Sequence, residues 1–309
     1  MDSDRRQARR RELARRRRRT LAGLSLLLVA VAVAAVVLLA EAGGSAPTSH
    51  RVASARTPAH RSPAVASTGK PGTESAPILM YHVINPPPAG APFPGLYVSA
   101  SEFAAQMQAL ADAGYHAVTL DQLWSYWKRG TPLPPGKPIV VSFDNGYQSQ
   151  DSNALPVLRR LGWVGDENLQ LTGLPPSQGG LSEAQVRELV AAGWELDTQG
   201  FSHADLITLD AQQLAYQVAT ARHVVQQRYG VPVNWFCYPS GDYDATVIAA
   251  VQAAGYDGST TVVPGWASPA SDPYRLPRLR VLGGTSPESL LSEIAAIRED
   301  PPPPASYSA

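Results

Sequence analysis

Residues Val140–Gln150 read VVSFDNGYQSQ, in which an apolar run stops abruptly at three polar or small residues. Ile139–Phe143 predicts a buried strand, and Asp144, Asn145 and Gly146 follow it directly. Asn-Gly is a common turn signal, so the triplet has a purely conformational explanation. It also stands where a parallel barrel places its catalytic side chains, at the carboxyl end of a strand. The choice between a turn and a catalytic position depends on which other residues lie at the same edge of the predicted sheet.

Strand-like and helix-like segments alternate through the rest of the chain. Short apolar runs predict strands at 77–84, 116–120, 137–143, 167–173, 194–199, 234–239, 257–263 and 276–282. Helical spacing of apolar residues predicts helices at 101–115, 121–130, 152–162, 182–193, 210–230, 244–256 and 287–299. This alternation indicates a parallel sheet covered by helices, either a barrel or a doubly wound sheet. In a barrel, Asp144, Gln199, His203 and Pro239 fall at the strand ends where chemistry collects.

Three strand ends carry unusual residues. They are SFDNGY, GWELDTQGFSHADL (Gly193–Leu206) and FCYPSGDY (Phe236–Tyr243). Each has a simple explanation by itself, because Asp144 can cap a turn, His203 can be a polar loop residue and Pro-Ser-Gly breaks a strand. Their occurrence at the ends of strands of one sheet favours a shared site.

At these residues the sequence resembles the polysaccharide deacetylases, or carbohydrate esterase family 4. The resemblance covers nearly all of residues 77–285, in the order LMYH, SEFAAQMQALADAGYHAVTLDQL, VSFDNGY, GWEL…SHADL, FCYPSGDYD, AAGYDGSTTVVPG and LPRLRV. It implies a distorted (β/α)7 barrel. It also implies removal of acetyl groups from chitin, peptidoglycan or a related glycan.

The resemblance further implies a divalent metal, usually zinc, held by one Asp and two His, with a second Asp as base. Asp144 occupies the base position, and Asn145, Gln199 and His203 occupy the metal-ligand positions. Only His203 is a retained ligand, because two neutral amides replace a carboxylate and an imidazole. Amide oxygens do not suit zinc, so the substitutions predict weak metal binding. The oxyanion donor of the family is a backbone N–H, which Ser240 would supply.

The remaining site predictions concern the walls of the cleft. His82, Tyr147, Tyr238, Pro239 and Trp266 are expected to line it, although core packing is the commoner role for Tyr147, Tyr238 and Trp266. Arg278 and Arg280 on the last strand are expected to orient Asp144 by a salt bridge. Cys237 replaces an arginine of the family motif and is interpreted as buried packing. Asp197 and Asp205 are alternative carboxylates for the metal.

The amino-terminal region predicts a membrane anchor. Residues 1–19 carry ten Arg against Asp2, Asp4 and Glu12, and Leu21–Ala40 follows without a charge. Twenty apolar residues suffice to cross a bilayer, and the arginines predict a cytoplasmic amino terminus. A cleavable signal ending at Ala40-Glu41-Ala42 is the alternative, and both place the domain outside the cytoplasm. A nucleic-acid partner for the arginines is disfavoured by the adjoining apolar segment.

These features divide the chain into five parts. Residues 1–19 form a basic cytoplasmic segment, 20–41 a transmembrane anchor, 42–76 a flexible linker, 77–299 the deacetylase-like domain and 300–309 a disordered tail. Residues 77–309 hold 12 Lys plus Arg against 21 Asp plus Glu, a net charge of −9. A single cysteine excludes an internal disulfide.

Two functions remain open. One is a single-pass, membrane-anchored extracytoplasmic deacetylase that hydrolyses the C–N amide of acetylated cell-wall or surface polysaccharide. The alternative is a catalytically inactive relative that binds such a glycan or a cell-wall enzyme. A shared fold decides neither, because function resides in the site.

Overall fold

The computed structural model describes residues 69–174 and 179–308. The predicted transmembrane anchor and basic segment lie outside these residues. Within the described residues, no helix is both long enough and apolar enough to span a membrane.

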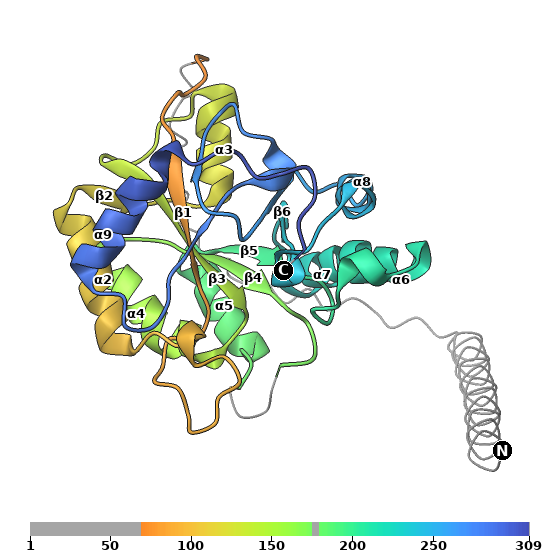
Figure 1. Cartoon of the computed structure of the whole chain (residues 1–309), viewed down its shortest axis with the longest axis horizontal. Helices are drawn as coiled ribbons and strands as arrows, with labels where there is room; N and C mark the ends of the chain where they lie inside the picture. The colour runs from red at the N-terminus through yellow and green to blue at the C-terminus, as the bar shows by residue number, and fades with distance from the viewer. Residues whose placement is uncertain (1–68, 175–178, 309) are drawn as a thin grey trace, which may run out of the picture. The chain divides into compact units, whose positions relative to one another are not determined.

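Parallel strands form the centre of the domain and helices surround them (Figure 1). The strands are β1 (Ala76–Tyr81), β2 (Tyr115–Ala117), β3 (Lys137–Asn145), β4 (Asp166–Leu169), β5 (Glu195–Thr198), β6 (Trp235–Cys237), β7 (Gly258–Thr260), β8 (Trp266–Ala267) and β9 (Leu279–Arg280). The helices are α2 (Ala100–Asp112), α3 (Leu120–Arg129), α4 (Leu155–Leu161), α5 (Glu183–Ala191), α6 (Ala211–Ala215), α7 (Ala221–Tyr229), α8 (Ala245–Ala253) and α9 (Pro287–Ala296).

The sheet has the strand order β7-β6-β5-β4-β3-β1-β8, with β2 paired to β3 and β9 paired to β1. Every pair is parallel except β1 with β8. This is an α/β half-barrel of parallel strands, as the alternating sequence pattern predicts. The segment before β9 extends it, because Thr260 bridges Leu276 and the Arg278 N–H donates to the Val263 carbonyl at 2.9 Å. Arg278 is thereby carried into the interior of the sheet.

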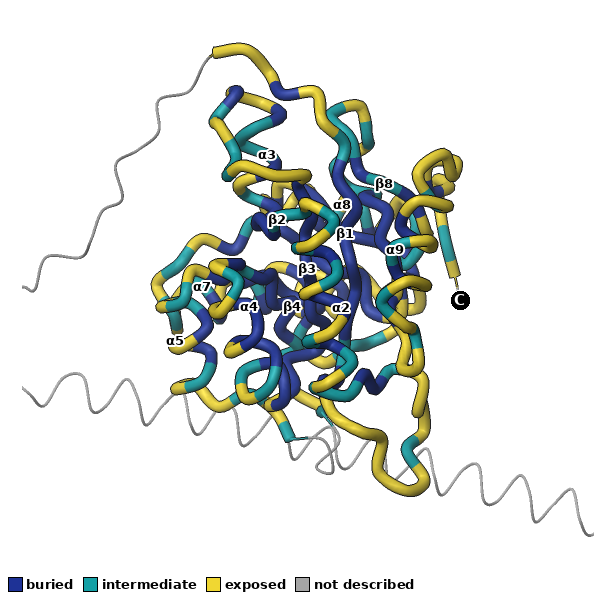
Figure 2. The backbone as a smooth tube through the Cα atoms, turned by 90° about the vertical axis from the view of Figure 1, so that its left-hand side faces the viewer, coloured by how far each residue is buried: buried dark blue, intermediate teal, exposed yellow. Residues whose placement is uncertain are grey.

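Strand β3 organises the core. Its residues are buried except Lys137, and they alternate between two faces. Phe143 packs against the helix layer, with its ring centroid 4.9 Å from Trp194 and 5.8 Å from Phe103. Ser142 and Asp144 face the interior, where polar partners are required. The burial colours of Figure 2 follow this arrangement, with buried backbone at the strands and exposed backbone on the surrounding segments.

Local sequence signals set the helix ends. Four helices in the described part of the chain begin with a capping box. The side chain of the cap accepts a hydrogen bond from the backbone N–H of the third helical residue, and the side chain of that residue accepts one from the backbone N–H of the cap. The caps are Ser99, Thr119, Ser182 and Asp210. The predicted helix at 210–230 contains a π-helical turn, Tyr216–Thr220, between α6 and α7. These caps fix the residue at which each helix begins.

Both predicted limits of the domain need correction. At the start, the Gly72 N–H donates to the Tyr126 carbonyl at 2.9 Å and Ala76 already belongs to β1, so part of the expected linker packs on the domain. At the end, the prediction of a disordered tail is wrong for residues 300–308. Tyr307 exchanges two 2.9 Å backbone hydrogen bonds with Tyr243, and its ring stacks on that of Tyr243. Composition suggested disorder there, but a long-range backbone pairing orders the segment.

Candidate active site at the strand ends

A cavity of about 530 Å³ lies at the carboxyl ends of the strands. Its lining includes Asp144, Asn145, Gln199 and His203, the four side chains that the sequence motifs single out. Asp144 and Asn145 end β3, whereas Gln199 directly follows β5 and His203 lies in the next loop. Parallel pairing aligns these strand ends, so residues more than fifty positions apart share one space.

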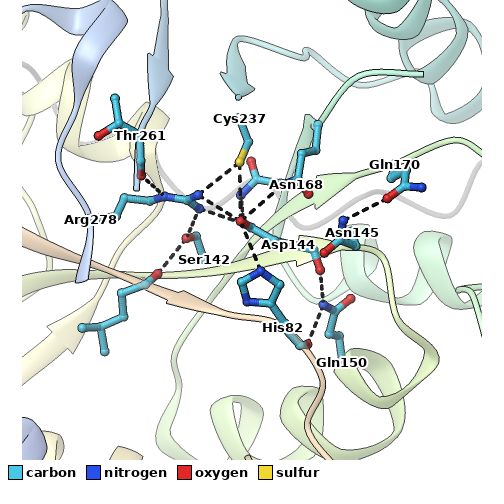
Figure 3. A network of polar contacts seen from close by, with 12 residues as sticks. His82, Ser142, Asp144, Asn145, Gln150, Asn168, Gln170, Cys237, Thr261 and Arg278 are labelled. Atoms are coloured by element: carbon cyan, nitrogen blue, oxygen red, sulfur yellow. Dashed lines mark hydrogen bonds and ion pairs between the residues drawn. The ribbon is translucent and has the colours of Figure 1, made fainter. Parts of the chain in front are cut away.

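Asp144 is the centre of a buried polar network (Figure 3). Its side chain is 1% exposed, and Arg278, which is fully buried, donates from Nη1 to Oδ1 at 2.7 Å and from Nη2 to Oδ2 at 2.9 Å. Asn168 donates to Oδ1 at 2.9 Å, and Gln199 Nε2 lies 3.5 Å from Oδ2. His82 Nε2 lies 4.0 Å from Oδ2. The carboxylate therefore has a defined partner on each oxygen.

The guanidinium of Arg278 is equally well satisfied. Its Nε donates to the Thr261 carbonyl at 2.8 Å, and its Nη1 reaches Ser142 Oγ at 3.2 Å. Its Nη2 also lies 3.2 Å from the Cys237 sulfur. A buried charge is tolerated only when it is paired and hydrogen-bonded, and both halves of this pair meet that condition.

The ion pair controls protonation in the cavity. Burial alone would raise the pKa of Asp144, but the charge and hydrogen bonds of Arg278, together with His82 and Asn168, lower it to about 2. Burial lowers the pKa of His82 to about 4, against the opposing effect of Asp144. Burial also raises the pKa of the Cys237 thiol. At neutral pH, Asp144 is therefore ionised, His82 is neutral and Cys237 is a thiol.

Backbone conformation also marks this cavity. Among the described residues, the non-glycine residues with positive φ are Asn145 (79°), His203 (53°) and Ser240 (57°), and all three line the cavity. A left-handed conformation costs about 1–3 kcal/mol for a residue with a side chain, and such residues cluster at functional sites. Three separate segments of the chain thus accept backbone strain around one cavity.

The two amides hold different positions. Asn145 Nδ2 donates to Gln170 Oε1 at 2.9 Å, which fixes the orientation of its amide. Gln199 is 3% exposed, and its Oε1 is buried without a hydrogen-bond partner in the described structure. An unpartnered buried oxygen that borders a cavity is suited to accept a hydrogen bond from a ligand.

Zinc does not fit this donor set. Both oxygens of Asp144 are engaged by the buried guanidinium, whose positive charge opposes a second cation. The donors at the predicted ligand positions are the His203 imidazole and the neutral amide oxygens of Asn145 and Gln199, and amide oxygens are poor ligands for zinc. The His82 imidazole also lines the cavity, but its Nε2 faces the Asp144 carboxylate that Arg278 already occupies. Asp197 and Asp205 are absent from the cavity lining, so neither supplies the missing carboxylate.

The other predicted residues divide into two groups. His82, Tyr147, Tyr238, Ser240 and Arg280 line the cavity. Arg278 lies behind Asp144, and it pairs with that carboxylate whereas Arg280 does not among the described residues. Pro239 is buried but does not line the cavity.

Trp266 was expected in the cleft, and this expectation is wrong. It lies in β8 and its indole N–H donates to the Ile294 carbonyl at 2.8 Å, so it packs the core beside α9.

Several residues of the network have no counterpart among the predictions. Asn168 and Gln170 contact Asp144 and Asn145, and Gln150 Nε2 donates to the Asp144 and His82 carbonyls at 2.8 and 2.9 Å. The run ENLQLTG carried a usable signal, because polar residues at alternate positions of a buried strand indicate a polar interior face. The exposed ring of Phe93 also borders the cavity, from a loop that the sequence leaves unassigned.

Comparison with known proteins agrees with this arrangement. Residues 132–259 match the sequence profile of the family described as Polysaccharide deacetylase. The Bacillus subtilis (strain 168) protein YxkH, which carries the name polysaccharide deacetylase, is 29% identical over 210 residues, or 68% of this chain and 72% of YxkH. These matches support this chain as a member of the polysaccharide deacetylase family.

Two further relatives describe the range of the polysaccharide deacetylase family. The Streptococcus pyogenes deacetylase PplD, solved in complex with acetate, is 25% identical with a TM-score of 0.65, covering 73% of this chain and 99% of PplD. The Escherichia coli (strain K12) poly-β-1,6-N-acetyl-D-glucosamine N-deacetylase is 24% identical over 248 residues, covering 66% of this chain and 36% of that enzyme. This chain therefore spans about a third of the length of the Escherichia coli relative.

The buried ion pair predicts a large and asymmetric mutational effect. Arg278→Met leaves the Asp144 carboxylate buried and unpaired, so we expect the free energy of unfolding to fall by about 3–5 kcal/mol. Arg280→Met is the matched control, because Arg280 is exposed, and it should change stability by about 0.5 kcal/mol or less. Urea denaturation at pH 7 measures both. Equal effects of the two substitutions would contradict the role of the Asp144–Arg278 pair.

The two shifted groups predict acid sensitivity. In the unfolded chain, His82 binds a proton below about pH 6.5 and Asp144 below about pH 4. In the folded chain, His82 binds a proton only below about pH 4 and Asp144 only below about pH 2. The unfolded state therefore binds more protons, and stability is lost as pH falls through these windows, by at most about 1.4 kcal/mol per pH unit for each group. His82→Gln should flatten the loss between pH 6.5 and 4. Parallel wild-type and variant curves across that window would refute the assignment to His82.

Proposed function

We propose that this protein acts on an acetylated cell-surface polysaccharide, with deacetylation as its class of activity. The observation that carries the proposal is the convergence of Asn145, His203 and Ser240, in strained conformations, around Asp144 in one cavity. A volume of about 530 Å³ lies within the range of small-ligand sites. The named activities of the family relatives support the same class of substrate.

The cavity offers suitable contacts for an acetamido sugar. Gln199 Oε1 can accept a hydrogen bond from an amide N–H or a hydroxyl group, and the backbone N–H of Ser240 can donate to an acetyl oxygen. Tyr147 and the exposed Phe93 present apolar surface on the same lining. The reaction would break the C–N bond of the acetamido group and add water, giving acetate and a free amine.

Glycan binding without hydrolysis is a second candidate, and one observation favours it. Asn145 and Gln199 remove the anionic and imidazole donors of the family metal, while Arg278 holds the pKa of Asp144 at about 2. A general base works best when its pKa lies near the working pH, so Asp144 is a weak base at pH 7. The two candidates share the cavity and differ only in whether acetate is released.

Acetate release by the wild-type protein separates the two candidate functions, and a paired substitution tests the predicted ligand positions. Wild-type full-length protein, solubilised in detergent, is incubated with N-acetylglucosamine oligomers while acetate release and calorimetric binding are measured. Both candidate functions predict that the wild-type protein binds the oligomers. Only the deacetylase predicts that acetate is released. Asn145→Asp with Gln199→His should raise zinc binding and acetate release at least about tenfold, because a carboxylate and an imidazole return to the ligand positions. Asn145→Asp with Gln199→Ala is the control. Absence of both binding and acetate release in wild type would reject the proposal.

We propose that residues 21–40 anchor the chain in the cell membrane with the domain outside. The arginine block before this apolar segment supports that orientation. Protease added to intact cells should remove residues 69–308 of the full chain while a tag placed before Met1 stays protected. Recovery of a mature chain beginning near Ala42 would instead establish cleavage of the segment, and full protection of the domain would refute export.

A further inference from the structure

A second polar centre lies in the interior of the sheet, apart from the cavity. Asp166 and Glu195 are the first residues of β4 and β5, and they are paired in the parallel register. Asp197 lies two residues after Glu195, so its side chain emerges on the same face. None of the three lines the cavity. This acidic cluster, Asp166, Glu195 and Asp197, therefore belongs to a different layer of the interior.

Each carboxylate of the acidic cluster is fixed through one oxygen. Asp166 Oδ2 accepts from the Leu120 N–H, Glu195 Oε2 from the Asp121 N–H and Asp197 Oδ1 from the Trp235 N–H, all at 2.9 Å. These donors belong to the start of α3 and to β6. The side chains cannot turn away without breaking a hydrogen bond to the backbone.

The second oxygen of each carboxylate accepts no hydrogen bond from a backbone N–H, although the carboxyl groups of Glu195 and Asp197 can share a proton and the Thr119 side chain can hydrogen-bond to Glu195. Asp166 Oδ1, Glu195 Oε1 and Asp197 Oδ2 are buried and unsatisfied within the described structure, and Asp166 and Asp197 are fully buried. One ligand atom from each residue lies within 4.8 Å of the other two. An unpartnered buried carboxylate oxygen is costly, and the acidic cluster contains three of them.

No positive side chain offsets this charge. Among residues 69–174 and 179–308, no Lys, Arg or His forms a salt bridge with the acidic cluster. The nearest further charge is Asp121, whose carboxylate accepts from Asn234 Nδ2 and Trp235 Nε1. Protonation is one way to lower this charge, since burial and the charge of Asp121 raise the pKa of Glu195 to about 8, and burial and neighbouring carboxylates raise the pKa values of Asp166 and Asp197 as well. A proton shared by two carboxylates, however, leaves the third oxygen without a partner.

We propose that Asp166, Glu195 and Asp197 bind a hard divalent cation of the Ca²⁺, Mg²⁺ or Mn²⁺ class. Oxygen atoms are the ligands that these ions prefer, and Ca²⁺–O distances of about 2.3–2.6 Å place opposite ligands about 4.6–5.2 Å apart. The separation of up to 4.8 Å therefore matches a common centre. Asp121 and Glu195 are partly exposed, so the acidic cluster lies near the surface at the start of α3 and β5.

The role of this cation is structural. It would tie β4 and β5 to α3 and β6, because the same carboxylates already hold the backbone of those elements. It is also separate from the metal that the family resemblance implies, whose ligand positions line the cavity. The proposal is independent of the glycan function.

The test uses full-length protein in detergent, stripped with chelator and titrated with MnCl₂ at pH 7.5. Electron paramagnetic resonance and calorimetry should show one tightly bound Mn²⁺, and the thermal midpoint should rise by about 5 °C near saturation. Asp166→Asn with Asp197→Asn should abolish both effects. Glu183→Gln with Glu188→Gln, which removes two exposed charges from α5, should keep them.

Each outcome decides the proposal. Retained Mn²⁺ binding in His203→Ala supports the acidic cluster as the site, and loss of binding in that variant would place the ion in the cavity and overturn the proposal. Folded wild type that binds no Mn²⁺, Ca²⁺ or Mg²⁺ at millimolar concentration would also overturn it and assign protons to the cluster. If the double variant fails to fold, Asp197→Asn alone provides the same comparison.

Discussion

The ion pair between Asp144 and Arg278 is the interaction on which the rest of the site depends. Both side chains are buried, and the two hydrogen bonds between them, at 2.7 and 2.9 Å, connect the end of β3 to the segment that extends the sheet. A buried charge in this position requires its partner, so the end of β3 and the segment that carries Arg278 stabilise each other's placement. The pair also fixes the charge at the floor of the cavity.

The ion pair between Asp144 and Arg278 determines what chemistry the cavity can perform. The parallel sheet brings its strand ends together at one cavity, and Asn145 and Gln199, which the sequence comparison predicts to stand at two metal-ligand positions, are amides. A guanidinium already neutralises Asp144, so the site is electrically complete without a metal. Three residues with left-handed backbone conformations, Asn145, His203 and Ser240, surround this neutralised carboxylate. Such strained residues cluster at functional sites.

The sequence predicted the general architecture and much of the site because both follow from local patterns. Alternating strands and helices indicated a parallel sheet, and strand ends aligned by that sheet brought Asp144, Asn145, Gln199 and His203 together. Alternation along the last strand placed Arg278 and Arg280 on the same face, but only depth in the sheet determines which one meets Asp144. The place of Trp266 depends on a contact with α9, and the acidic cluster on the β4–β5 register, so neither is visible locally.

The pairing of Tyr307 with Tyr243 has a practical consequence for handling the protein. Tyr243 Oη also donates to the Pro304 carbonyl at 2.8 Å, and Arg275 donates to the Pro303 carbonyl at 3.2 Å, so the final residues are fastened at several points. Deleting them to obtain a shorter chain would strip these acceptors and uncover an aromatic ring. A reporter protein fused after Ala309 would be separated from Tyr307 by only Ser308 and Ala309, so it would need its own spacer.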